Sequence, residues 1–251
     1  MSDSHLQADI FSRTERLIGA DGLRRLNETR VIIFGLGGVG SWTAEALIRS
    51  GIGSITLVDA DCVATSNINR QSIAFLSTVG RSKAELLRDR LLDINPAAEI
   101  IARHELYTSE TASSFLLDDY DYVIDAIDSL KDKALLQINA CRSRARLVAS
   151  MGAALKMDPT RIRVDEFRNV KGCRLAAALR NKYKRSGVWP ARKFKCVWSD
   201  ELLPNQGIET YDSSGAMSFG KVSFNGAMCH ITAIFGFTLA GLVIESALSP
   251  R

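Results

Sequence analysis

Apolar residues up to position 152 fall into short continuous runs that alternate with amphipathic stretches of helical spacing. The runs are bounded by Gly, Asn, Asp and Pro, as buried strands are. They predict strands at residues 31–35, 55–61, 99–106, 120–128 and 146–152. The amphipathic stretches predict helices at residues 13–28, 41–51, 82–94, 111–119 and 131–145. Apolar strands that alternate with helices indicate an α/β fold, a Rossmann-like, doubly wound and mostly parallel sheet with helices on both faces.

The alternation of strands and helices ends near residue 156. Beyond it the pattern predicts a strand at residues 161–167, a basic helix at 174–185, and a long region rich in Gly, Ser and polar residues at 186–222. We therefore predict one integrated domain with two parts. Residues 1–156 form the core with an N-terminal helix, and residues 157–251 form a C-terminal extension.

Residues 227–248 are apolar over almost the length that a bilayer crossing requires. The segment contains His230 and Glu245, and no basic cluster precedes it. These features favour a core helix that returns to the sheet over a membrane span. We expect no insertion into a membrane.

The charge and the cysteines narrow the classes of function. The net charge is +4, so any contact with nucleic acid requires a local basic patch. The five cysteines are scattered and form no CxxC pair, which argues against a disulfide framework and against a structural zinc site. The N-terminus also lacks the layout of a signal peptide. We expect a reducing, cytoplasmic location.

A glycine-rich loop follows the first predicted strand, in the stretch VIIFGLGGVGS. Gly35, Gly37 and Gly40 match G-x-G-x-x-G between a strand and a helix, the pattern of a dinucleotide site. Asp59, at the end of the second strand, supplies the carboxylate that such a site uses for a ribose hydroxyl. These residues alone serve NAD and ATP equally well.

The residues downstream favour ATP over NAD. Polar and cationic side chains follow the second strand: Asn67, Asn69, Arg70, Gln71 and Lys83. A triphosphate under attack needs this positive charge, because negative charge develops on the departing pyrophosphate. The fourth strand ends in DAIDS, where Asp125 and Asp128 supply carboxylates that suit Mg²⁺. Solvated surface and local turns are the alternative explanation for these polar residues.

In order and spacing, the motifs GLGGVGS, DADCV, SNINRQ, GRSKAE and DAIDS resemble those of the ThiF/MoeB/HesA group. Its members are relatives of ubiquitin-activating enzymes and adenylylate a carboxylate with ATP. The resemblance implies that Gly38 packs against the nucleotide and that Asp59 binds its ribose. It further implies the following roles: Asn67 and Arg70 contact phosphate, Lys83 contacts the triphosphate, and Asp128 holds magnesium. It also implies a homodimer in which an N-terminal arginine reaches into the partner's site, with Arg16 the better match and Arg13 the alternative.

Within that group, the chain is most similar to the tRNA threonylcarbamoyladenosine dehydratases. The motifs DPTRIRV, KCVWSDE and ITAIFGF carry this similarity in the C-terminal part. It implies activation of the threonine carboxylate of a modified adenosine beside the anticodon, followed by closure of a hydantoin ring. The alternatives are adenylylation of a ubiquitin-like or sulfur-carrier protein and a non-catalytic nucleotide-binding regulator. The product nucleotide, AMP or ADP, and a sulfur-transfer partner of the cysteine desulfurase type stay open.

Basic side chains far outnumber Asp165 and Glu166 between residues 161 and 195. This block suits the phosphates of tRNA, although a solvated helix explains the composition equally well. The residues predicted to contact tRNA lie on the basic helix: Arg180, Lys182, Lys184 and Arg185. The aromatic residues Tyr183, Trp189 and Phe194 lie within the block and provide stacking surfaces for an unpaired base.

Cys196 is the one candidate for a catalytic cysteine. It lies in KCVWSDE, with Lys193 and Lys195 before it. Ring closure is intramolecular, so a cysteine nucleophile is optional. A structural cysteine is the stronger interpretation, because reactivity requires an electropositive environment that sequence does not reveal.

Overall fold

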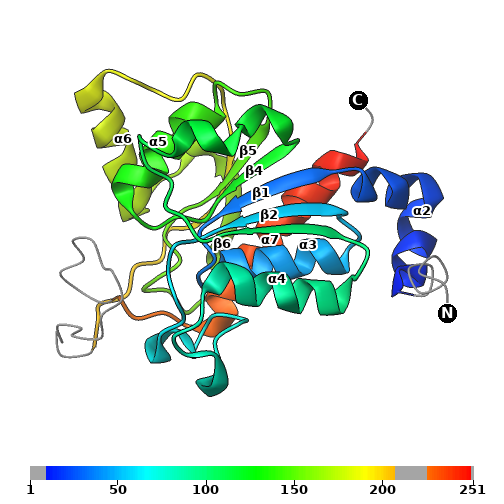
Figure 1. Ribbon diagram of the computed structural model, residues 1–251. Helices are drawn as coiled ribbons and strands as arrows, with labels where there is room; N and C mark the ends of the chain where they lie inside the picture. The colour runs from blue at the N-terminus through cyan, green and yellow to red at the C-terminus, as the bar shows by residue number, and fades with distance from the viewer. Residues whose placement is uncertain (1–9, 207–224, 250–251) are drawn as a thin grey trace.

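The computed structural model describes residues 10–206 and 225–249, which form one sheet with helices packed against both faces (Figure 1). The strands are β1 (Arg30–Phe34), β2 (Ser54–Val58), β3 (Glu99–Arg103), β4 (Tyr122–Asp125), β5 (Arg146–Ser150), β6 (Ile162–Glu166) and β7 (Lys195–Ser199). The α-helices are α2 (Ser12–Asn27), α3 (Gly40–Arg49), α4 (Lys83–Ile94), α5 (Leu130–Ala140), α6 (Arg174–Ser186) and α7 (Cys229–Leu248). The 3₁₀ turns are η1 (Thr65–Asn67), η2 (Leu76–Thr78), η3 (Ala112–Phe115), η4 (Leu117–Asp119), η5 (Pro159–Arg161) and η6 (Phe167–Asn169).

The strands lie in the order β3-β2-β1-β4-β5-β7-β6. All neighbouring strands are parallel except β6, which runs antiparallel to β7. The chain leaves β1 towards β2 and β3, then returns to place β4 on the other side of β1. The predicted Rossmann-like, doubly wound and mostly parallel sheet is confirmed.

Two apolar layers sandwich this sheet. The first contains buried residues of α3, α4 and α7, and the second contains buried residues of α5 and α6. Figure 1 shows these two sets of helices on opposite sides of the strands. Successive residues of the central strands face opposite layers, as Ile32 and Ile33 do on β1, which explains why β1 is apolar from Val31 to Phe34.

Helix α7 is the returning core helix that the sequence predicts. Phe235, Leu239 and Val243, one turn apart, are fully buried and belong to the first apolar layer. Among the described residues it is the one helix with the length and hydropathy of a membrane span, and 44 % of its most apolar window is buried. Its packing against α3, β5 and β7 is that of a core helix.

The region rich in Gly, Ser and polar residues at 186–222 contains strand β7, which the sequence did not predict, and its residues 207–222 lie outside the described residues. Strand β7 lies between β5 and β6 and pairs with both, so it is central to its part of the sheet. Its apolar run, Cys196 to Trp198, is short and is enclosed by lysines and an aspartate. Only pairing with its two neighbours stabilises so short a strand. Because β6 and β7 extend the sheet beyond β5, both predicted parts of the chain contribute to a single sheet; the boundary at residue 156 itself stays a prediction.

Several predicted elements differ in their ends or type. The stretch predicted as a helix at residues 111–119 is instead η3 and η4, because Leu116 between them adopts a left-handed conformation with φ of 45°. Helix α2 contains a kink at Gly19, whose φ is 75°. The predicted strands that end in polar residues stop earlier, at Val58, Arg103 and Asp125. In each case the polar residues beyond the strand belong to loops at one edge of the sheet.

Candidate functional site

The carboxyl ends of β1, β2 and β4 form one edge of the sheet, and the loops that follow them carry most of the predicted site residues. The strand order reverses between β1 and β4, which are adjacent. In open α/β sheets the crevice at such a reversal is where ligands bind. The topology therefore brings the predicted residues to the edge of the sheet where such ligands bind.

Two glycines give the loop after β1 its shape. Gly35 has a φ of 86°, and a Cβ there would lie 2.7 Å from the carbonyl oxygen of Ala126. A Cβ on Gly40 would lie 1.8 Å from the carbonyl oxygen of Gly35. Any side chain at either position would therefore displace the loop from β4 or from the start of α3. A Cβ on Gly38 would lie 3.1 Å from the side chain of Thr232 on α7 and 3.2 Å from that of Arg70, closer than an ordinary van der Waals contact.

Asp59 connects the second strand to this loop. Its Oδ2 accepts a hydrogen bond from the backbone N–H of Leu36 at 2.6 Å, and its Oδ1 accepts one from Asp61 at 2.8 Å. Burial raises the pKa of Asp59, and the nearby Lys83 opposes this shift. A carboxylate fixed beside the glycine loop has the position that a ribose hydroxyl requires.

The polar stretch after β2 folds around Arg70. The Arg70 guanidinium donates to the carbonyl of Ser66 and to Oδ1 of Asn69, both at 2.9 Å. Burial lowers the pKa of Arg70, and Asp128 opposes this shift. The Arg70 side chain lies beside Gly38 and Ala126 lies beside Gly35, so the stretch after β2 and the turn after β4 both border the glycine loop. The structure thus brings together segments that lie far apart in the sequence.

The three amide side chains of the stretch after β2 have different surroundings. Asn67 accepts from the backbone N–H of Ala64 and so shapes η1. Asn69 donates to the carbonyl of Ala227, which ties the stretch to the segment before α7. Gln71 is buried, and its Oε1 has no hydrogen-bond partner within the described part of the chain. The Gln71 atom nearest to Gly37 is the amide nitrogen Nε2, which lies 3.7 Å from the position that a Cβ on Gly37 would take.

Lys83 begins α4 at the same edge. Its Nζ donates to Oδ2 of Asp61 at 2.8 Å, and its side chain is 7 % exposed. Asp61 is 47 % exposed, so this pair borders solvent on the carboxylate side. A lysine side chain that donates one hydrogen bond in this way has two further N–H groups for an anionic ligand.

A second lysine forms a buried network that the sequence interpretation missed. Lys133 of α5 donates to Oδ1 of Asp125 at 2.9 Å, to the carbonyl of Asp125 at 3.3 Å and to that of Ile127 at 2.9 Å. Gln137 donates to Oδ2 of Asp125 at 2.7 Å and accepts from the Tyr183 hydroxyl at 2.7 Å. Burial raises the pKa of Asp125, and Lys133 opposes this shift. The network holds the turn that leads to Asp128.

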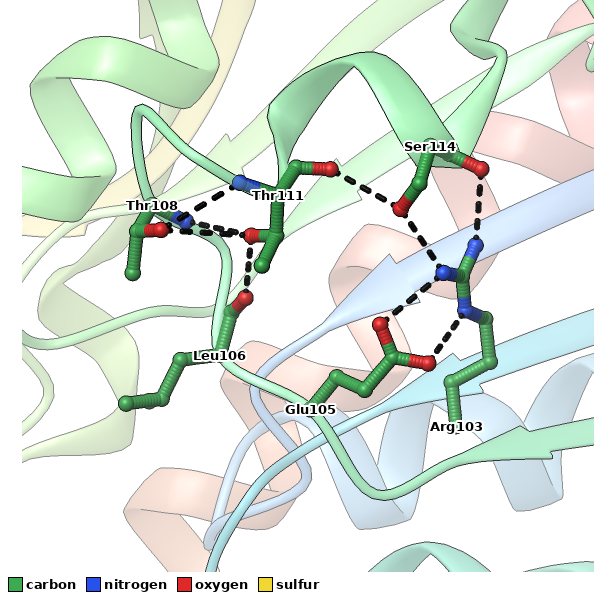
Figure 2. A network of polar contacts seen from close by, with 6 residues as sticks. All are labelled: Arg103, Glu105, Leu106, Thr108, Thr111 and Ser114. Carbon is green, nitrogen blue, oxygen red and sulfur yellow. Dashed lines mark hydrogen bonds and ion pairs between the residues drawn. The ribbon is translucent and has the colours of Figure 1, made fainter.

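A further polar network stiffens the connection after β3, as Figure 2 shows. Arg103 donates to both oxygens of Glu105 and to the hydroxyl of Ser114. Its guanidinium also lies 4.0 Å from the centre of the Phe115 ring. The neighbouring His104 contacts the carbonyl of Ala60 at 2.7 Å. The connection is therefore fixed against the loop that carries Asp59.

The predicted site residue Arg16 lies far from the edge formed by the carboxyl ends of β1, β2 and β4. It is exposed on α2, and α2 packs where the strands begin: Leu23 and Phe11 lie beside Gly51, just before β2. The glycine loop lies at the other ends of β1 and β2. Arg16 therefore does not belong to the site of its own chain, and neither does Arg13 on the same helix.

Cys196 does not have the environment of a nucleophile. It is fully buried in β7, and burial raises the pKa of its thiol well above the ordinary value. The charge of Lys133 opposes that shift without reversing it, and Asp125 adds to it. A thiol that is neutral and inaccessible is a poor nucleophile. The prediction of Cys196 as a catalytic residue is thus corrected in favour of the structural interpretation.

The residues predicted to contact tRNA differ in how far they are available. Lys184 and Arg185 are exposed and Lys182 is half-buried, all in the last turns of α6. Arg180 donates to the carbonyl of Val170 and lies over the Phe167 ring, so it stabilises its own surroundings. Helix α6 begins near Asp200, beyond the end of β7, and its 13 residues place the last turn roughly 20 Å away.

No group of three or more His, Cys, Asp or Glu side chains is placed to hold a metal ion in residues 10–206 and 225–249. The expectation that the protein contains no structural zinc stays a prediction.

A family model described as "ThiF family" matches residues 11–246 of the sequence. The chain belongs to the ThiF family. The match includes the edge of the sheet that carries the glycine loop, Asp59, Arg70 and Lys83, called the nucleotide edge below. It also includes the C-terminal strands and helices, so the ThiF family accounts for nearly the whole chain. The resemblance identified from GLGGVGS, SNINRQ and DAIDS is confirmed.

Relatives within the ThiF family cover most of this chain. It is 43 % identical over 191 residues to the tRNA threonylcarbamoyladenosine dehydratase of Bacillus subtilis, which covers 76 % of this chain and 74 % of the relative. It is 36 % identical over 250 residues to that of Escherichia coli, covering 95 % and 93 %. The crystal structure of the E. coli dehydratase in complex with ATP has a TM-score of 0.82 and 34 % identity, covering 96 % of this chain and 94 % of that one.

Proposed function

We propose that this ThiF-family protein is an ATP-dependent tRNA threonylcarbamoyladenosine dehydratase. The main support for this proposal is that one edge of the sheet holds the glycine loop together with Asp59, Arg70, Lys83 and Asp128. Relatives of that name cover nearly the whole chain, and one of them has been solved with ATP. An acidic residue for the ribose and two cations for phosphate suit ATP, whereas hydride transfer from NAD has no use for the cations.

The reaction that this site would support has two steps. A carboxylate oxygen of the threonyl group attacks the α-phosphorus of ATP, an O–P bond forms, and pyrophosphate leaves. The ureido nitrogen then attacks the activated carbonyl carbon, the bond to AMP breaks, and the nitrogen loses its proton to solvent. Arg70 and Lys83 stabilise the charge on the phosphates, and Asp59 orients the ribose. No step requires a cysteine, which agrees with the burial of Cys196.

Asp128 is the residue that we propose for magnesium. It is exposed at the end of the turn after β4 and faces Arg70, so a cation there would join a carboxylate to the phosphate oxygens. When bound, Mg²⁺ neutralises the triphosphate. The Lys133 network fixes the turn that presents Asp128 to it.

The direct test is incubation of the protein with ATP, Mg²⁺ and tRNA that contains N6-threonylcarbamoyladenosine, followed by mass analysis of the nucleosides. We expect the modified nucleoside to lose one water and AMP to accumulate in equal amount. An unchanged nucleoside would contradict the proposal. If a small carrier protein with a free C-terminal carboxylate is adenylylated instead, the site activates a protein rather than tRNA.

NAD provides the nucleotide control. Because the site is built for phosphates with a metal, ATP should raise the melting temperature and NAD should not. Equal stabilisation by NAD would contradict the assignment of the nucleotide.

We also propose a homodimer, because Arg16 lies at the far end of the sheet from its own site. Leu17 beside it is 85 % exposed, and Leu76 of η2, near the nucleotide edge, is 81 % exposed. Leu17 and Leu76, at opposite edges of the sheet, would both be covered if α2 of one copy packed near η2 of the other. A mixture of Arg16→Ala and Lys83→Ala proteins should then recover part of the activity through hybrid sites. Arg13→Ala mixed with Lys83→Ala is the matched comparison, and no recovery despite subunit exchange would contradict sharing.

The last turns of α6 are proposed to contact the RNA backbone. Changing Lys182, Lys184 and Arg185 together to Glu should weaken tRNA binding and leave ATP binding unchanged, because α6 ends far from the nucleotide edge. The slope of log K against log salt should fall by about 0.7 to 0.9 for each lost phosphate contact. An unchanged salt slope would show that these residues are ordinary solvated surface. The chemistry requires a tRNA-containing compartment, and we propose the cytoplasm.

A further inference from the structure

A hollow lies beside the end of α6, between η6 and the segment that precedes β7. Phe167 and Arg168 line it on one side, and Trp189, Pro190 and Phe194 line it on the other. The Phe167 and Phe194 rings stack at 5.2 Å with an interplanar angle of 13° and are both buried, so they form a rigid apolar base. The hollow is separate from the nucleotide edge, since it lies where the chain enters β7 rather than where β1 and β4 end.

Trp189 is the most exposed of the aromatic residues that line the hollow. Its side chain is 39 % exposed, whereas Tyr183 is fully buried and Phe194 is 5 % exposed. The ring folds back against Tyr183, with 5.5 Å between centroids. The backbone that carries it is also held, because Val188 accepts from and donates to the hydroxyl of Ser186. An exposed aromatic ring that is already ordered can bind a flat partner at low entropic cost.

The charges around Trp189 favour an anionic partner. The Arg168 guanidinium lies 5.8 Å from the Trp189 ring, and Lys184 and Arg185 are exposed on the preceding turn of α6. Glu166 is the carboxylate that lines the hollow, and it is paired with Lys193 at 3.3 Å. Cations beside a partly exposed aromatic ring form a combination that binds single-stranded nucleic acid, with the bases stacked and the phosphates neutralised.

Arg192 shows that not every cation of this region belongs to the surface. It donates to the carbonyls of Ala140, Cys141, Ser143 and Ala145, so it caps the end of α5. Its charge is used within the fold. Arg192 therefore holds the segment before β7 in place, and the binding charge comes from Arg168 and α6.

The position of the hollow excludes the reacting adenosine as its occupant. Cys196 on β7 is level with Asp125 on β4, and the hollow lies before β7 begins, on the far side of β5. Two to three strand spacings separate it from β4, roughly 10–15 Å. A base held here belongs to another part of the same RNA loop.

We propose that Trp189 and Arg168 form a stacking site for a second unpaired base of the RNA, whose backbone follows the last turns of α6. This inference rests on the proposed function. It makes Trp189 a determinant of RNA affinity that takes no part in the chemistry. It also predicts selectivity for a single-stranded loop over a duplex, because only an unstacked base has a free face.

The test uses Trp189→Leu, which retains an apolar contact with Tyr183, with Val188→Ala as the matched neighbour. The probes are an RNA hairpin with an unpaired loop and the fully paired duplex of its stem. Removing one stacked base should weaken hairpin binding about 5- to 150-fold and leave duplex binding unchanged. The salt slope of Trp189→Leu should stay that of the unaltered protein, because no phosphate contact is lost. Val188→Ala should bind both probes normally.

Tryptophan fluorescence gives a second readout. The hairpin should quench the emission of the unaltered protein, and Trp189→Leu should abolish this quenching. Equal weakening for hairpin and duplex, or no weakening, would overturn the stacking site. Quenching by polyglutamate as strong as that by the hairpin would also overturn it, in favour of an acidic protein partner. If the protein binds and is quenched by the hairpin but never dehydrates modified tRNA, the proposed function fails and the stacking site stands.

Discussion

Two lysine–aspartate pairs at neighbouring strand ends have the same charges and different roles. Lys133 and Asp125 are both 0 % exposed, and Lys133 directs all three of its N–H groups to acceptors of the turn after β4. Lys83 has Asp61 as its hydrogen-bond partner among the described residues, and Asp61 is 47 % exposed. A buried pair with every donor used stabilises a turn, whereas a pair with free donors and an open side can bind a phosphate. Burial and the number of partners, rather than residue type, distinguish these two lysines.

The largest expected effect is loss of the buried lysine. Lys133→Met leaves the Asp125 carboxylate in the apolar layer without its cation, which should cost about 3–5 kcal/mol in the free energy of unfolding. Denaturant unfolding measures this loss. The double variant Lys133→Met with Asp125→Asn removes both charges and should recover much of it. A single variant within about 1 kcal/mol of the unaltered protein would contradict the structural role of this pair.

The opposite outcome is expected for the pair of Lys83 and the half-exposed Asp61. Lys83→Ala should lower the rate of dehydration by about 100- to 1000-fold, because charge on the departing pyrophosphate loses its partner. The free energy of unfolding should change by less than about 1 kcal/mol, since Asp61 is partly solvated. Arg88→Ala on the exposed side of α4 is the matched control and should leave the rate unchanged. Retained activity in Lys83→Ala would refute its role in catalysis.

Tyr183→Phe tests how far the buried network extends. It leaves Oε1 of Gln137 buried without a donor, which should cost about 1–3 kcal/mol. Tyr120→Phe removes a hydroxyl of similar type that contacts Thr56 at a half-buried position, where water can replace it. Denaturant unfolding measures the loss of free energy of unfolding in both variants. Equal losses would show that burial of the network adds nothing to the stability that its hydrogen bond provides.

Glu45 provides an intermediate case with a pH signature. Burial acts to raise its pKa, but the hydrogen bonds from Arg90 and Arg49 outweigh it and lower the pKa of Glu45. A lowered pKa contributes stability that is present above the ordinary value of 4.5 and is lost as the pH falls through the lower folded value. Glu45→Gln should therefore be less stable than the unaltered protein by about 1 kcal/mol at neutral pH, because both arginines are partly exposed. The difference should shrink on acidification to about pH 3; a constant difference would contradict the linkage.

Much of the nucleotide edge follows from sequence because its parts lie directly after strands. Gly35, Asp59 and Asp125 each stand at or beside the end of an apolar run, and parallel strands bring such ends together. The same argument cannot distinguish Lys83 from Lys133. Both lie in the first turn of a helix that follows such a loop, and only the surrounding apolar layer makes Lys133 inaccessible.

The C-terminal part shows where sequence reasoning fails. The aromatic residues Tyr183, Trp189 and Phe194 are equivalent by composition, yet among them only Trp189 is exposed to solvent. Cys196 follows two lysines closely in sequence, yet β7 turns it into the apolar layer on the α5 and α6 side. Both outcomes depend on β7, whose short apolar run did not predict a strand.

The sequence by itself determined the α/β class, the glycine loop and the acidic and basic residues that mark a triphosphate site, because these depend on periodicity and on local backbone requirements. The tertiary structure alone decided that Lys133 supports the turn, that Arg16 lies far from its own site, and that Cys196 is buried. These properties arise from contacts between segments distant in the chain. Burial changes the cost of a charge and the reactivity of a thiol, and no local pattern of residues records it.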